Sequence, residues 1–158
     1  MSLANIRTQI KTILDGVSGI GIVHDYDRYV NDWNKLLSLF KPTTQAKING
    51  WIITRTATPA QWSAIARRHR VYSFLIRGYY SHDDATASEI TFQELIESIY
   101  AAFENNETLN DTCETTSPDF GPETGKAGIQ VPLVDLRVFG DVLCHYCELT
   151  IGAQESAP

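Results

Sequence analysis

The stretch Arg68–Ser81 reads RHRVYSFLIRGYYS and decides the expected fold class. Successive side chains of a β-strand point to opposite sides, so an alternating segment predicts a strand with two different faces. The apolar face carries Tyr72, Phe74, Ile76, Gly78 and Tyr80, and the mixed face carries Val71, Ser73, Leu75, Arg77 and Tyr79. The alternation predicts a long strand that lays its apolar face on a hydrophobic core.

Helices are expected on both sides of this strand in the sequence. The segment Thr91–Glu104 opens with TFQE, a capping box in which the threonine and glutamate side chains satisfy free backbone amides. Its apolar residues recur at helical spacing, and the same spacing predicts helices over Leu3–Asp15 and Asp32–Phe40. Pro42 prevents the last of these helices from continuing.

Four further strands complete the expected sheet. Lys47–Thr56 is rich in β-branched and aromatic residues, which favour strands, and Ile20–Asp25 predicts a short strand. Ile129–Phe139 and Val142–Gly152 flank a tight-turn signal at residues 140–141, so they predict an antiparallel hairpin. Helices and strands do not alternate regularly. We therefore expect an α+β fold, with a mixed or mainly antiparallel sheet and helices packed on one face.

A single domain is expected over residues 1–153, because a chain of 158 residues is of ordinary size for one core. Residues 105–128 are polar and contain several glycines and prolines, which predicts a long loop with a brief strand near Leu109–Cys113. Residues 154–158 are expected to form a disordered tail.

The composition excludes some classes of function. The formal net charge of -6 argues against a nucleic-acid binder, because phosphate contacts require clustered lysine and arginine. No apolar stretch is long enough to cross a bilayer, so no membrane partner is expected. The N-terminus lacks the pattern of a signal peptide, which predicts a cytoplasmic protein. The odd number of cysteines, Cys113, Cys144 and Cys147, predicts reduced thiols.

Charge is unevenly distributed along the chain. The basic residues of one stretch are Arg67, Arg68, Arg70 and Arg77. The acidic residues of another are Glu104, Glu107, Asp111, Glu114, Asp119 and Glu123. Such runs are ordinarily solvated surface. The alternative is that the two groups form complementary faces that meet when subunits assemble, and we take all of these residues except Glu123 as the candidate oligomer interface.

Two patterns in the sequence are candidates for metal or catalytic sites. The pair Cys144 and Cys147 has a spacing known from zinc sites, but alternation in a strand would point the two thiols to opposite faces. The segments HDYD at 24–27 and SHDD at 81–84 both follow strands, where histidine and aspartate can serve a metal-dependent hydrolase. Turn-forming residues also collect at strand ends. No catalytic residue, metal or cofactor is therefore expected.

The layout of the chain resembles the tail terminator and head–tail neck proteins of long-tailed bacteriophages. The resemblance is carried by the segments YSFLIRGY at 72–79, TFQELIESI at 91–99 and VLCHYCELTI at 142–151, in the order helix, strand, long strands, helix, polar loop and final strand. It spans about residues 3–151. None of these segments is a diagnostic motif of the family, so the resemblance assigns no functional residue to this chain.

The resemblance implies a structural virion protein that forms a ring, usually hexameric, capping the tail tube and joining it to the head. DNA would pass through this ring without specific binding. The protein would be found in the host cytoplasm during assembly and then in the virion. The long loop would become ordered only against the tail tube or a neighbouring subunit. Two other functions remain open, namely a small metal-dependent hydrolase and a small bacterial ligand-binding or regulatory module.

Overall fold

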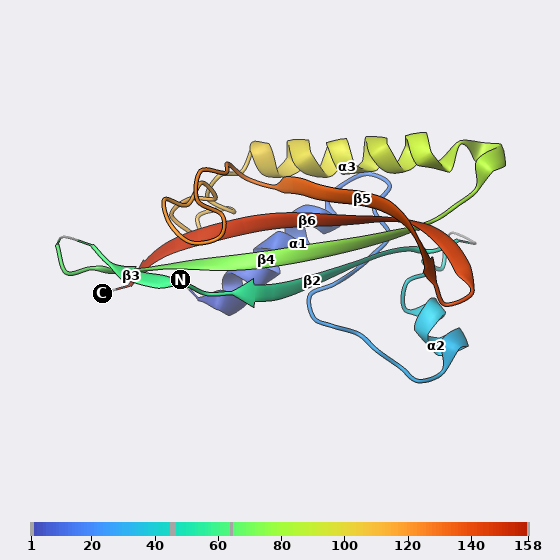
Figure 1. The fold of residues 1–158 in the computed structure, drawn as a ribbon, viewed down its shortest axis with the longest axis horizontal. Helices are drawn as coiled ribbons and strands as arrows, with labels where there is room; N and C mark the ends of the chain where they lie inside the picture. The colour runs from blue at the N-terminus through green and yellow to red at the C-terminus, as the bar shows by residue number, and fades with distance from the viewer. Residues whose placement is uncertain (1, 45–46, 64, 158) are drawn as a thin grey trace.

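A six-stranded mixed sheet forms the centre of the protein in a computed structural model that describes residues 2–44, 47–63 and 65–157 (Figure 1). Its strands are β1 (Ile22–His24), β2 (Asn49–Ala57), β3 (Ala60–Trp62), β4 (Arg68–Ser81), β5 (Gln130–Phe139) and β6 (Val142–Ala157). The order is β1-β2-β4-β6-β5, with β3 paired to the start of β4. Only β1 and β2 are parallel among these described pairs. The expected α+β class with a mainly antiparallel sheet is confirmed.

The longest pairing in the sheet joins β4 to β6. It runs without interruption from Arg68 opposite Ala157 to Ser81 opposite Cys144. The predicted strand Arg68–Ser81 is therefore confirmed at both ends. The predicted hairpin is confirmed as well, because β5 and β6 pair down to Phe139 and Val142.

The expected tail is wrong for residues 154–157, because β6 continues through them. Gln154 and Glu155 are buried. Backbone hydrogen bonds join Gln154 to Glu114 and Thr115, and the Tyr72 hydroxyl donates to Glu155 Oε1 at 2.8 Å. Polar residues end the chain, but partners far away in the sequence satisfy them, so composition alone could not reveal this strand.

Helices α1 (Leu3–Asp15) and α3 (Ser88–Glu104) cover one face of the sheet (Figure 1). The Ser2 side chain caps α1 by accepting from the Asn5 amide, as the preference for serine at this position predicts. The core on this face joins residues of both helices with Trp51, Tyr72, Phe74, Ile76, Leu149 and Ile151. This is the face that the alternation in β4 assigned to the core.

The start of α3 differs from the expectation. The helix begins at Ser88, one turn before the capping box at Thr91, and follows a short 3-10 turn over Asp84–Thr86. Ala87 precedes it in the left-handed region with φ 51. The Ser88 hydroxyl accepts from the Asp83 amide at 2.8 Å and so stabilises this earlier start.

Helix α2 (Trp33–Ser38) packs on the opposite face of the sheet, so the expectation that the helices share one face is wrong. A second, smaller core holds Leu36 of α2 together with Phe40, Ile52 and Cys144. Phe40 lies so close to the strand below that a Cβ at Gly50 would be 2.3 Å from its ring. An apolar stripe shows that a helix packs on a sheet but does not show on which face.

The loop between α3 and β5 is folded against its own subunit. Leu109 and Cys113 are buried, and a bridge joins Thr115 to Gln154 of β6. The predicted strand near Leu109–Cys113 is absent from this described segment, because residues 109–111 turn through positive φ.

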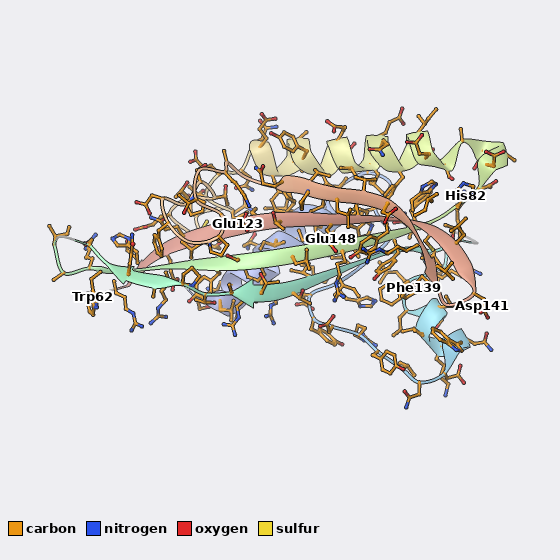
Figure 2. The ribbon with its side chains drawn as sticks, in the orientation of Figure 1. Trp62, His82, Glu123, Phe139, Asp141 and Glu148 are labelled. Carbon is orange, nitrogen blue, oxygen red and sulfur yellow. The ribbon has the colours of Figure 1, made fainter. Side chains whose placement is uncertain are left out.

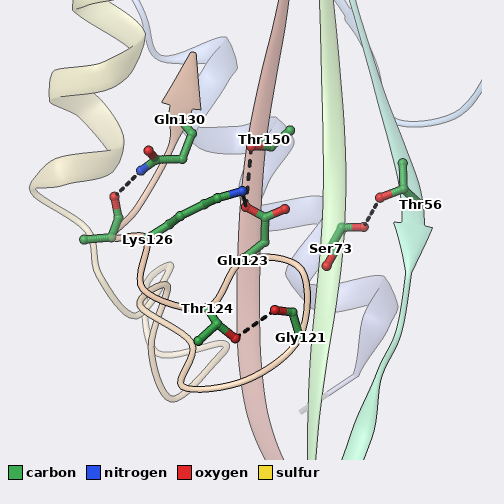
Figure 3. A network of polar contacts seen from close by, with 9 residues as sticks. Thr56, Ser73, Gly121, Glu123, Thr124, Lys126, Gln130 and Thr150 are labelled. Carbon is green, nitrogen blue, oxygen red and sulfur yellow. Dashed lines mark hydrogen bonds and ion pairs between the residues drawn. The ribbon is translucent and has the colours of Figure 1, made fainter. Parts of the chain in front are cut away.

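A buried carboxylate anchors the far part of this loop. Glu123 lies over the sheet, where Lys126 Nζ is 3.2 Å from its Oε2 and the Thr150 hydroxyl is 3.5 Å away (Figure 3). A Cβ at Gly152 would come within 2.8 Å of the Glu123 side chain, so the loop covers the strand closely. The loop thus has its own packing inside one subunit and does not need a neighbour to become ordered.

Candidate functional site

The predicted basic residues occupy two separate places. Arg67 and Arg68 are exposed at the hairpin formed by residues 60–63 and 65–70, which we call the arm. Arg70 lies at the base of the arm, 3.9 Å from the Glu155 carboxylate. Arg77 points to the opposite face of the sheet, where it pairs with Asp27. The structure therefore brings together three of the four predicted arginines and separates the fourth.

The predicted acidic residues are spread over the end of α3 and the folded loop. Glu104 and Glu107 line a hollow, and Asp111 lies in the turn that follows. Glu114 faces the arm of its own chain, with Oε2 3.8 Å from His69 Nδ1. Asp119 is exposed, and its backbone amide donates to the Gln154 side chain. Only part of this group is therefore free to meet another subunit.

An exposed apolar surface runs along β5, at the edge of the sheet. Leu136 is 50% exposed and Val138 is 71% exposed, and Val134 and Leu143 continue the surface. These side chains lie on the same side of the sheet as α3, because Leu136 pairs with His145, whose ring stacks on Phe92 of α3. Exposed apolar patches of this kind commonly mark interaction sites.

The neighbouring flank of α3 is acidic and forms the wall of this surface. Glu89, Gln93, Tyr100 and Glu104 share one flank at helical spacing, and Glu89 lies close enough to His145 to act on its pKa. At the C-terminal end of α3, this flank borders the hollow that Tyr100, Phe103, Ile129, Glu104 and Glu107 line. We call the apolar surface of β5 together with this flank the trough.

The arm carries exposed apolar side chains beside its arginines. Trp62 is 71% exposed and Ile65 is 76% exposed. Trp62 and His82 lie at opposite ends of the long axis of the molecule, so the arm and the His82 end of the trough are far apart (Figure 2). One chain thus has two different exposed apolar surfaces, one beside basic residues and one beside acidic residues.

A second hollow lies between the segment after β1 and the α2 face of the sheet. Aromatic side chains line it, namely Tyr29, Trp33, Phe40, Tyr79 and Phe139. The Arg77–Asp27 pair closes one side of the hollow. Trp33 and Tyr29 are largely exposed here. Such a site offers flat apolar contacts and one charged pair to a ligand.

The two histidine–aspartate segments lie on opposite faces of the sheet. His24 Nε2 is 2.7 Å from the Leu39 carbonyl oxygen and its ring contacts Phe40, on the α2 face. The ring centroids of His82 and His145 are 5.1 Å apart, on the α3 face. The structure therefore does not bring His24 and Asp25 together with His82 and Asp83. Among the described residues, no group of three or more histidine, cysteine, aspartate or glutamate side chains could hold a metal ion.

A buried serine–histidine pair joins α3 to β6. Ser88 Oγ and His145 Nε2 are 2.8 Å apart, and both residues are almost fully buried. Burial, followed by the charge of His82, lowers the pKa of His145 below its ordinary value of 6.5. The same serine oxygen accepts from the Asp83 amide. The pair thus fixes the start of α3 and offers a substrate no access to its atoms.

The cysteines are poor nucleophiles. Cys144 belongs to the α2-side core and Cys147 to the α1/α3-side core, so they point to opposite faces as the alternation predicted. Burial raises the pKa of Cys144 to about 11, and it raises the pKa values of Cys113 and Cys147 to about 12. Thiols, rather than the reactive thiolates, are present at neutral pH.

Comparison with known proteins adds no assignment. The chain matches no protein-family model, and the search of curated proteins gives no significant match. Within the described residues, no helix is long and apolar enough to span a membrane.

Sequence reasoning missed both exposed apolar surfaces. The alternation of Val134, Leu136 and Val138 was available as a signal, but it predicted a strand and not exposure. Their exposure depends on where α3 lies over the sheet. Strand β3 was missed because Pro59 and the residues around it indicated a break, whereas the chain turns back there and pairs with the start of β4.

Proposed function

We propose that the protein is a structural subunit that assembles head to tail with copies of itself into a closed ring. The ring would act as a tail terminator or neck component, capping a phage tail tube and joining it to the head. The resemblance in layout supplies the specific role. The surfaces of the chain supply the reason for assembly.

One observation carries the proposal, namely that one chain exposes two unlike apolar surfaces. The arm has Trp62 and Ile65 beside arginines, and the trough has Leu136 and Val138 beside glutamates. A heterologous contact uses two different patches of the same chain, and it closes into a ring when the rotation between subunits allows it. A two-fold dimer would instead use one patch twice.

The charge distribution supports passage of DNA through such a ring. Residues 78–125 contain eleven aspartate and glutamate residues and no lysine or arginine. This segment includes α3 and most of the loop, so it gives one side of the subunit a negative field. If this side lines the lumen, the field repels the phosphate backbone and prevents tight binding of DNA.

Light scattering coupled to gel filtration tests the proposal. We expect the average mass to rise from that of the 17.7 kDa chain to a fixed plateau as protein concentration increases, because a closed ring stops growing. A mass that stays at the monomer value up to millimolar concentration would contradict self-assembly.

The aromatic hollow beside Trp33 favours a second candidate, a ligand-binding module. The Arg77 guanidinium could pair with the carboxylate of an aromatic acid while Tyr29 and Phe139 contact its ring. Titration of benzoate and indole-3-carboxylate, followed by NMR of the Trp33 side chain, tests this function. Saturable shifts that Arg77→Gln abolishes would support it, and an unchanged spectrum would exclude these acids as ligands.

A further inference from the structure

We propose that the arm of one copy docks into the trough of the next copy, with its arginines against the acidic flank of α3. This inference rests on the head-to-tail assembly proposed above and names the surfaces that form the contact. The occupant of the trough is thus a second copy of this chain.

The trough is an apolar surface that the single subunit leaves uncovered. Strand β5 is at the edge of the sheet, and it presents the apolar side chains of Val134, Leu136 and Val138 to solvent on the side of α3. Edge strands with exposed apolar residues associate with other chains unless they are covered. Burying this surface against another chain would be favourable, because it removes exposed apolar area from water.

The arm and the trough carry opposite charges. The helix α3 contains Glu89, Glu94, Glu97 and Glu104 and no basic residue. Glu89 and Glu104 lie on the flank of α3 that belongs to the trough, and Glu107 lies just beyond the helix. The arm instead has Arg67, Arg68, His69 and Arg70 within four consecutive positions. Opposite charges on two surfaces select partner and register and speed association.

The arm of a chain cannot reach the middle of its own trough. Leu136 lies level with Tyr80 of β4, because both pair with His145. The arm joins the rest of β4 at Arg70, toward the other end of the same strand. Ten residues at about 3.3 Å each separate Arg70 from Tyr80 by roughly 33 Å along a continuous strand. The arm that reaches the middle of the trough must therefore come from another molecule.

The arm also has the right shape and composition to enter. It projects beyond the loop at one end of the molecule (Figure 1). Trp62 and Ile65 are its large exposed apolar side chains, and tryptophan and arginine are among the residues most enriched at the positions that dominate binding at interfaces. We expect Trp62 to pack on the apolar surface of β5, while Arg67 and Arg68 face the glutamates.

Charge reversal tests the proposal. One variant combines Arg67→Glu with Arg68→Glu, a second combines Glu89→Arg with Glu104→Arg, and a third carries all four changes. All four side chains are exposed, so the variants should fold, and circular dichroism during heating checks this. Light scattering measures the protein concentration at which half of the chains are assembled.

We expect each reversed pair to raise that concentration on the order of tenfold or more, because like charges then face each other. The third variant should return to within about threefold of the parent, since its charges are again complementary. Glu94→Arg, on the other flank of α3, is the matched control and should leave assembly unchanged.

Each other outcome is informative. Two results would overturn the docking of the arm while leaving head-to-tail assembly in place. In one, the reversed variants assemble as well as the parent; in the other, the third variant does not recover assembly. If Leu136→Lys leaves assembly intact but abolishes binding to purified tail tubes, a different partner occupies the trough and the inference is overturned. A parent that stays monomeric overturns both proposals.

Discussion

Cys113, Cys144 and Cys147 show most simply how burial controls chemistry in this protein. All three side chains are at most 4% exposed, and burial raises their pKa values to between about 11 and about 12. We expect Ellman's reagent to modify none of them in the native protein and all of them after unfolding in guanidinium. Rapid modification of one thiol without unfolding would show that this side chain is accessible.

His145 gives the protein a specific dependence on pH. Its pKa is below 6.5 in the folded state, so the unfolded chain binds more protons as the pH falls below that value. The free energy of unfolding should therefore decrease from pH 6.5 down to the folded pKa. Ser88, His82, Glu89 and Phe92 surround the ring, and burial is the largest cause of its lowered pKa.

The variant His145→Gln isolates this contribution. Glutamine keeps a polar group near Ser88 but does not titrate, so the loss of stability between pH 6.5 and pH 5 should be smaller than in the parent. Urea unfolding at several pH values measures the difference. Parallel curves for the two proteins would contradict a lowered pKa at His145.

At the scale of elements, the end of β6 offers a sharp test. Deleting residues 154–158 removes the end of the β4–β6 pairing together with the hydrogen bonds of Gln154 to Glu114 and Thr115 and of Glu155 to Tyr72. At about 1 kcal/mol each, these last three bonds alone should lower the free energy of unfolding by about 3 kcal/mol. Deleting Pro158 alone is the control. Urea unfolding compares the two, and equal midpoints would mean that these residues do form a loose tail.

The parts of the fold that the sequence predicts correctly are those set by interactions between residues close together in the chain. Leu3–Asp15 and Arg68–Ser81 were predicted at both ends, because a cap and an alternating pattern are local signals. The start of α3 depends in part on Ser88 meeting His145, 57 residues away, and no local pattern contains that contact.

The candidate site was predictable to a smaller extent. Arg67, Arg68 and Glu104 were named from charge runs, and they are exposed at the two surfaces of the proposed contact. Arg77 and Glu114 belong to the same runs but face partners in their own subunit. A charge run cannot distinguish these cases, since the distinction depends on which strands and loops cover each residue.

At the scale of the whole molecule, the arm and the trough are attached to one continuous strand and its neighbours. The rigid β4–β6 pairing fixes the distance between them, so a docked arm would set the angle between successive subunits. A fixed angle is the condition for a ring of one size, whereas a variable angle gives open chains. The proposed contact therefore predicts a single number of subunits.

Native mass spectrometry of the purified protein tests this central claim most directly. We expect one dominant assembly whose mass is a fixed multiple of the 17.7 kDa chain and does not increase further at higher concentration. Monomer alone at every concentration, or a ladder of masses without an upper limit, would contradict a closed head-to-tail ring.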